Sequence, residues 1–157
     1  NFNVLRLNGS FGDFWARTFL RDENGVMVVD DTGRPQIGPE GYVGNNNPKS
    51  IIGWNNTFNY GKFGLSFTID ARFGGQVISV TDGYLNSFGV SEESAAARDA
   101  GGLDIPAVKM DGTPWEGKIP AQAYYSAVGN RDGIIEGQVY DATNIRMREI
   151  SLTYGLP

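Results

Sequence analysis

The sequence predicts a mainly β fold built of antiparallel strands. Glycine (22 residues) and proline (7) together make up 29 of 157 residues, well above the roughly 12% of average proteins, which indicates many turns. Hydrophobic residues make up 40% of the chain and aromatic residues 12%, which excludes a disordered composition and favours short aromatic-rich strands. The clearest single signal is residues 63–73, where apolar and polar side chains alternate without a break.

Charge and composition exclude several functions. The formal net charge is −5, which argues against sequence-independent binding of DNA or RNA, because such binding depends on clustered cations. There is no Cys and no His, so disulfides, thiolate zinc sites and Ser-His-Asp or Cys-His catalysis are excluded within this chain. A glycosidase with paired carboxylates is the one enzyme that this composition allows, and no motif around Glu136 or Glu149 supports it. We therefore expect no enzyme, no metal site and no cofactor.

The chain shows no helical membrane segment. No run approaches 18 apolar residues, which excludes a transmembrane helix but not a membrane-spanning β-strand. The first residues, NFNVLRLNGS, lack the pattern of a signal peptide and the initial Met. We expect Asn1 to be a cut end in the middle of a longer pattern.

Residues 1–50 are predicted to form a hairpin followed by a loop. The strand pattern from Phe2 to Leu20 is interrupted by glycines, and a second strand, Val26–Val29, follows the residues RDENG. Asn24-Gly25 predicts the turn, since both residues tolerate positive φ. Residues 30–50 are dense in Gly, Pro, Asn and Asp and are predicted to be a loop without a packed element.

Residues 51–75 are predicted to form a hairpin of two long strands. Gly61-Lys62 makes a two-residue turn between them, and each strand has about ten residues, the length that crosses a bilayer at a tilt. Only Asn56 interrupts the apolar side of the first strand, and only Ile51 the polar side. The apolar side of the hairpin carries Phe58, Tyr60, Phe63, Leu65, Phe67, Ile69 and Phe73. A soluble β-sandwich that buries the same face in its core fits this pattern equally well.

Residues 76–138 are predicted to be a long loop with short helices. Ser91 is placed to cap a helix over the residues EESAAARDA, and Pro120 begins a second helix, PAQAYYSAV. Tyr84 and Phe88 are expected to pack within the loop. Residues 139–157 return to a strand, and the apolar phase inverts near Arg148, which predicts a bulge or a passage out of the membrane zone.

Two stretches of the chain resemble the SusC/RagA-type TonB-dependent outer-membrane transporters. The stretch YVGNNNPKSIIGWNNTFNYGKFGLSFTIDARFGGQV is similar to the family pattern G-N-x-x-P, G-[WF]-N-N-T-F-x-Y and D-x-R-x-G-G, here carried by residues 44–48, 53–60 and 70–75. The tail VYDATNIRMREISLTYGLP is similar to D-A-[ST]-[FY]-[IV]-R-[LM]-R-E-[VI]-[ST]-L-x-Y-x-L-P, with Asn144 where an aromatic residue is usual. The residues before Pro35 resemble the family more loosely.

The resemblance implies an incomplete portion of a 22-stranded transmembrane β-barrel in a Bacteroidetes-type envelope, with long extracellular loops. Residues 1–50 would be a hairpin and loop, 51–75 a transmembrane hairpin, 76–138 an extracellular loop and 139–157 a transmembrane strand; the plug domain would be absent. The apolar side of the hairpin, from Phe58 to Phe73, would then face lipid, and Asp70 and Arg72 would face the lumen. The implied function is uptake of glycan oligomers or peptides through the outer membrane. The implied partners are a SusD-like surface lipoprotein and TonB, which would act through the missing N-terminal plug region. A secreted carbohydrate-binding β-sandwich is the alternative.

Five residues are candidates for contact with substrate. Asp70 and Arg72 lie two apart on the polar side of their strand, either as a substrate-contacting pair or as a structural ion pair. Trp115, Tyr124 and Tyr125 lie in the long loop, where they would either stack on sugar rings or pack the loop on itself. Residues 146–149, with two arginines and a glutamate, suggest an anion site or, as we expect, a structural network.

Overall fold

The structure is a computed structural model that describes residues 6–129 and 132–156. The strand pattern expected at residues 2–5 and the terminal Pro157 lie outside these ranges. Of the described residues, 44% are in strands and 18% in helices, which confirms a mainly β protein with antiparallel sheets. Within the described residues the sheets are open and form no closed barrel. The chain divides into two compact units, unit 1 (residues 1–45 and 78–140) and unit 2 (residues 46–77 and 141–157).

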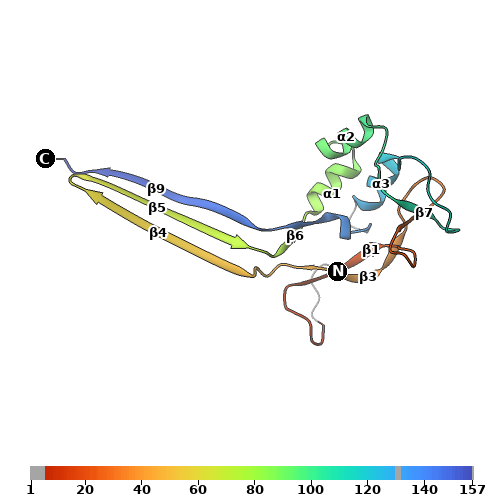
Figure 1. Cartoon of the computed structure of the whole chain (residues 1–157), viewed down its shortest axis with the longest axis horizontal. Helices are drawn as coiled ribbons and strands as arrows, with labels where there is room; N and C mark the ends of the chain where they lie inside the picture. The colour runs from red at the N-terminus through yellow and green to blue at the C-terminus, as the bar shows by residue number, and fades with distance from the viewer. Residues whose placement is uncertain (1–5, 130–131, 157) are drawn as a thin grey trace. The chain divides into compact units, whose positions relative to one another are not determined.

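Unit 2 is built on one long antiparallel sheet. Three strands of 11 residues each, β4 (Ser50–Tyr60), β5 (Phe63–Phe73) and β9 (Asn144–Tyr154), lie side by side in the order β4-β5-β9 (Figure 1). Tyr60 pairs with Phe63, so Gly61 and Lys62 form the two-residue turn that the sequence predicts. Gly61 has φ +58° at the first central position, where a type II′ turn favours glycine.

The predicted irregularity in the last strand is a β-bulge. In the β5–β9 ladder Thr68 pairs with Glu149 and Ile69 with Met147, so Arg148 has no partner across the ladder. An extra residue in one strand reverses the side on which the following residues point. The bulge therefore keeps Met147 and Ile150 on the same face of the sheet although they are three residues apart.

Unit 1 contains a strand where the sequence predicts a loop. Strand β3 (Ile37–Asn45) pairs antiparallel with β1 (Asp13–Phe19), so the loop expected over residues 30–50 is wrong for Ile37–Asn45. Gly38 is needed there for close approach rather than for a turn, because a Cβ atom at Gly38 would lie 2.7 Å from the carbonyl oxygen of Phe19. Glycine in a strand can mark a close backbone contact as well as a chain reversal.

Three turns of unit 1 share one geometry. The turns cover residues 22–26, 30–34 and 109–113. In each turn the N–H of the first residue donates to the carbonyl oxygen of the fifth residue, and the N–H of the fourth residue donates to the carbonyl oxygen of the first. The fourth residue is Gly25, Gly33 or Gly112, with φ between +80° and +84°. This is the three-residue hairpin loop with a glycine in the left-handed region. A turn is present at residues 22–26 as expected, but Asn24 does not share the positive φ of Gly25, so the turn is not the two-residue type. The expected pairing of the two flanking strands is wrong, because β1 pairs with β3 and the residues after the turn form β2 (Met27–Val29), which pairs with a later segment.

Two of these turns follow short strands that pair in parallel. Strand β2 (Met27–Val29) lies beside β7 (Ala107–Lys109), with Met27 opposite Ala107. The two strands come from the expected N-terminal hairpin and the expected long loop. Most of the expected hairpin-and-loop segment (residues 1–45) and most of the expected long loop (residues 78–138) therefore belong to one compact unit.

Three helices complete unit 1: α1 (Val80–Ser87), α2 (Glu92–Asp99) and α3 (Ala121–Val128). The last two are predicted by the sequence: the Ser91 hydroxyl accepts from the N–H of Ser94 at 3.1 Å, and Pro120 occupies the cap of α3. A 3₁₀ turn (Glu136–Gln138) precedes β8 (Val139–Asp141), which pairs with β6 (Gln76–Ile78) at the boundary of the two units. The buried core of unit 1 consists of Phe19, Met27, Val29, Ala107, Ile119, Ala127, Val128 and Ile134.

The helices in the described part of the chain are too short and too polar to cross a membrane.

Candidate functional site

The long sheet of unit 2 has one apolar face and one polar face. Residues directly opposite each other in a ladder point to the same side of a sheet. On one side, Trp54, Ile69 and Met147 are in register across the three strands, and so are Phe58, Leu65 and Leu152. On the other side, Thr57, Ser66 and Ser151 are in register. The apolar face comprises Ile52, Trp54, Phe58, Tyr60, Phe63, Leu65, Phe67, Ile69, Ala71, Phe73, Ile145, Met147, Ile150, Leu152 and Tyr154.

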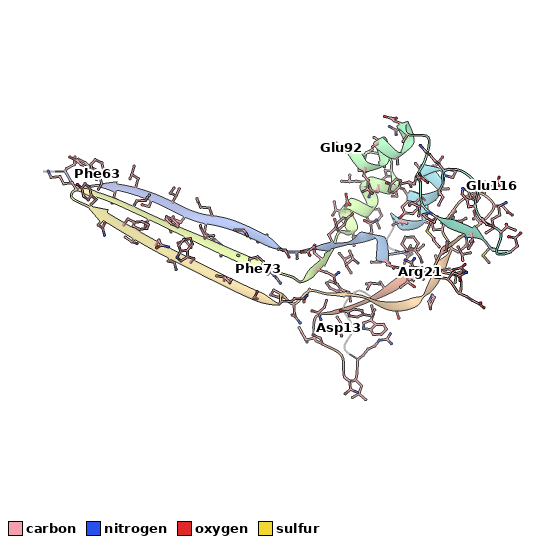
Figure 2. The ribbon with its side chains drawn as sticks, in the orientation of Figure 1. Asp13, Arg21, Phe63, Phe73, Glu92 and Glu116 are labelled. Carbon is pink, nitrogen blue, oxygen red and sulfur yellow. The ribbon has the colours of Figure 1, made fainter. Side chains whose placement is uncertain are left out.

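The apolar face is largely uncovered in unit 2. All seven residues that the sequence predicts to face lipid lie on it, and Tyr60 at the turn is 89% exposed. Phe63 and Phe73 mark the two ends of β5 in Figure 2. Phe67 is half-buried because its ring contacts Trp54 edge-on at 5.7 Å and stacks on Phe58 at 6.2 Å. A monomeric soluble protein rarely leaves so continuous an apolar surface exposed.

Aromatic residues gather at the turn end of the sheet. The ring of Phe63 lies 4.8 Å from that of Tyr154, its partner across the ladder, and Tyr60 is its partner on the other side. The tyrosine rings there are apolar and carry a polar hydroxyl, which suits a boundary between an apolar and a polar environment.

The polar face carries an ion pair that the sequence analysis did not identify. The guanidinium of Arg148 donates from Nε to Oδ1 of Asp70 and from Nη2 to Oδ2 at 3.2 Å. Asp70 and Arg72 do share the polar face, as expected, but the ion-pair partner of Asp70 is Arg148 rather than Arg72. Arg72 instead donates to the carbonyl oxygen of Asn46 at 2.9 Å. Of the three charged residues over 146–149, where a structural network is expected, only Arg148 forms a salt bridge among the described residues.

The three loop aromatics proposed for substrate contact pack inside unit 1. Tyr125 is only 3% exposed, and its ring meets that of Tyr124 edge-on at 5.3 Å. Tyr124 stacks on Phe19 at 6.2 Å, and both Tyr124 and Trp115 pack against the hydrophobic core. Lys109 lies over the Trp115 ring at 5.9 Å. In this arrangement the Tyr125 ring has no free face for a sugar, and the other two are half-buried.

A polar cluster around the buried Asn86 and Tyr125 links the helices of unit 1. The Tyr125 hydroxyl donates to Oε1 of Glu93 at 3.2 Å, and Asn86, which is 2% exposed, donates to the other oxygen of Glu93 at 3.5 Å. Tyr140 donates to Asp82. Burial, together with the neighbouring carboxylates, raises the pKa of both the Tyr125 and the Tyr140 phenol above the usual value of 10. These groups have structural partners, so they contribute to packing rather than to acid–base chemistry at neutral pH.

Tyr84 and Phe88 form an exposed pair that the sequence analysis expected to be packed. Their rings stack at 6.4 Å with an interplanar angle of 18°, and Phe88 is 75% exposed. Their spacing of four residues indicated that the two rings would be neighbours, because residues four apart lie on the same side of a helix.

The described residues contain no group of three or more acidic side chains arranged to hold a metal ion. Comparison with protein-family models finds no model that matches the chain, and a search of curated proteins finds no matching protein.

Proposed function

We propose that this chain is part of an outer-membrane TonB-dependent transporter of the SusC/RagA type, which imports glycan oligomers or peptides. The observation that carries the proposal is the long sheet of unit 2, with an uncovered apolar face and a polar, charged face. A barrel wall needs this division, because its outside contacts lipid and its inside contacts water. The sequence resemblance supplies the family and the class of cargo.

The strand length supports a membrane crossing. Eleven residues at about 3.4 Å each make a strand about 37 Å long. At a tilt near 45° such a strand spans about 26 Å, close to the roughly 25 Å apolar band of outer-membrane barrels. The aromatic group around Phe63 and Tyr154 then lies at one boundary of that band.

The connections between strands support an orientation. Strands β4 and β5 are joined by two residues, whereas β5 and β9 are joined by the long segment 74–143. Outer-membrane barrels have short periplasmic turns and long extracellular loops. In this proposal Gly61-Lys62 is on the periplasmic side and segment 74–143 is extracellular, where a SusD-like lipoprotein would contact the transporter. TonB would act through a plug region encoded outside these residues.

The carbohydrate-binding β-sandwich is the alternative. It requires a second sheet packed on the apolar face, and the exposure of that face in unit 2 favours the transporter instead. Glycosidase chemistry needs two available carboxylates, and Asp70 on the polar face is held in an ion pair by Arg148. We accordingly propose no catalytic role.

The deciding experiment is to identify the native polypeptide that carries these residues. Source cells are fractionated, and peptides from the chain are located by mass spectrometry together with the mass of the intact protein. The proposal expects an outer-membrane protein several times heavier than 17.1 kDa, with peptides from beyond both ends of this sequence. A secreted soluble protein of about this size would refute the transporter and support the sandwich.

A further inference from the structure

Two arginines line an open cavity on the polar side of unit 2. The cavity has a volume of about 510 Å³, and Arg72 of β5 and Arg146 of β9 both contribute to its wall. In the ladder Arg146 is opposite Asp70 and Arg72 is opposite Asn144, so the arginines are diagonal neighbours on adjacent strands. Diagonal neighbours in a sheet are about 7–8 Å apart, within the span of two long side chains that grip one ligand.

Neither arginine forms a salt bridge with a carboxylate among the described residues. Arg72 donates a hydrogen bond to the backbone carbonyl of Asn46, and its Nε is buried without an acceptor. Arg146 is exposed and forms no salt bridge within 4 Å in the described part of the chain, although it interacts electrostatically with Asp70 directly opposite. The nearest carboxylate across the ladder, Asp70, already accepts two hydrogen bonds from Arg148. A guanidinium that lacks an anion on a concave surface is a recognition site for a carboxylate or phosphate.

The rest of the lining does not neutralise the two charges. Its single carboxylate, Asp141, accepts from the backbone N–H of Thr143 at 2.6 Å. The cavity therefore carries one net positive charge in a chain whose net charge is −5. Amide side chains at Asn46 and Asn144 add donors and acceptors suited to hydroxyl groups.

We propose that the Arg72–Arg146 cavity binds the carboxylate groups of an acidic oligomer. The paired guanidiniums hold a carboxylate through bidentate hydrogen bonds, and the flanking amides contact the neighbouring polar groups of the same ligand. The idea that this oligomer is the transported cargo rests on the proposed function. The binding of a carboxylate in the cavity does not depend on that function. The carboxylate has two possible sources: a free oligomer, or an acidic side chain from elsewhere in the same polypeptide.

Arginine-selective labelling distinguishes these sources. The native full-length polypeptide is treated with phenylglyoxal, and adducts at Arg146 are quantified by mass spectrometry against exposed Arg34 in unit 1. The probes are trigalacturonate and triglutamate, and maltotriose is the neutral control. We expect Arg146 to react without a ligand and at least one acidic probe to slow its labelling about tenfold, with Arg34 unaffected. Protection of Arg146 before any probe is added would support a carboxylate supplied by the polypeptide itself.

The affinity of the protein for the protecting probe tests whether Arg72 and Arg146 form the site. It is measured for Arg146→Gln and Arg72→Gln, and Arg34→Gln is the control that removes one positive charge elsewhere. Each cavity variant should weaken binding of the protecting probe about tenfold, and the control should not. Labelling of Arg146 at the rate of Arg34 with every probe would overturn the proposal. If the native protein is soluble and an acidic probe protects its Arg146 from labelling, the transporter proposal is refuted and the carboxylate site is supported. If the native protein is a membrane protein and no acidic probe protects Arg146, the carboxylate site is refuted and the transporter proposal stands.

Discussion

Arg148 and Asp70 form a two-hydrogen-bond ion pair across the β5–β9 ladder, at the position where that ladder skips a residue. The two residues are 78 apart in the sequence. Because Arg148 is the extra residue of the bulge, its side chain reaches the polar face, where Asp70 lies, instead of interrupting the apolar row of Met147 and Ile150. The bulge therefore places Arg148 on the polar face, where it forms the ion pair with Asp70.

Deletion of Arg148 should be tolerated better than deletion of Ile150. Without Arg148 the ladder becomes regular, and all remaining residues of β9 stay on their present faces of the sheet. Loss of Ile150 instead shifts the register, so the side chains on one side of the deletion move to the opposite face. We expect the first deletion to lower the amount of folded protein slightly, through the lost ion pair, and the second to abolish folding. Protease resistance of the membrane-inserted protein measures both. Equal loss in the two deletions would contradict the register.

Substitution at two adjacent residues tests which face of the sheet contacts lipid. Ile69 lies on the apolar face and Thr68 on the polar face, both near the middle of β5. Arginine on the lipid side at mid-membrane costs about 2–4 kcal/mol, whereas arginine on the lumen side is tolerated. Ile69→Arg should therefore lower the free energy of unfolding in lipid vesicles by about that amount, with Thr68→Arg as the matched control. A larger loss for Thr68→Arg would reverse the assignment of the faces.

The strands of unit 2 were predictable because their signal is local. Strict alternation over residues 63–73 and the turn at Gly61-Lys62 determine both the faces and the register of β4 and β5. The bulge was also indicated, since the apolar phase changes near Arg148. The partner of Asp70 was not predictable, because it depends on which strand lies beside β5 and on the residue at which the ladder skips.

Unit 1 was harder to predict because its determinants are contacts between distant residues. Gly38 and the other glycines of β3 indicate a loop by composition, yet β3 pairs with β1 along most of its length. Helix α1 had a local signal that was missed: Ser79 caps it by accepting from the N–H of Asp82 at 3.2 Å, which is the Ser-x-x-Asp pattern of a helix start. The burial of Tyr125 depends on Glu93 and Asn86, which no spacing along the chain links to it.

Gly129→Ala should destabilise unit 1 strongly. A Cβ atom at Gly129 would clash with the carbonyl oxygen of Gly83 and the side chain of Ser87, so α1 and the end of α3 approach only because this residue has no side chain. Overpacking of this kind costs about 1–3 kcal/mol. Chemical denaturation followed by tryptophan fluorescence would measure the loss. Ala96→Ser, at an exposed position of α2, is the control and should change stability by less than about 0.5 kcal/mol.

Ser91 should stabilise α2 through its side chain. Its hydroxyl accepts from the N–H of Ser94 at 3.1 Å and donates to Asn86, which joins the helix start to the polar cluster around Asn86 and Tyr125. Ser91→Ala should lower the free energy of unfolding by about 1 kcal/mol, because a helix N–H loses its acceptor. Ser91→Asp keeps an acceptor and should restore part of the loss. If alanine and aspartate behave alike in thermal unfolding, the cap does not contribute as described.

The buried phenol of Tyr125 should make unit 1 sensitive to alkali. Burial, followed by the charge of Glu93 and the hydrogen bond to it, raises the pKa of Tyr125 in the folded state above the value near 10 of an unfolded chain. The unfolded state then loses its proton first, so the stability contributed by this phenol is complete below pH 10 and falls as the pH rises above 10. Tyr125→Phe should be less stable at neutral pH by about 1 kcal/mol, because the hydrogen bond is lost, but its stability should decline less steeply between pH 10 and 12.

Denaturation curves between pH 10 and 12 measure how steeply the stability declines, with Tyr42→Phe as the control for removal of a hydroxyl at an exposed position. A decline as steep in Tyr125→Phe as in the unmodified chain would show that Tyr125 does not carry the alkaline sensitivity, and Tyr140, which donates to Asp82, would be the next phenol to replace.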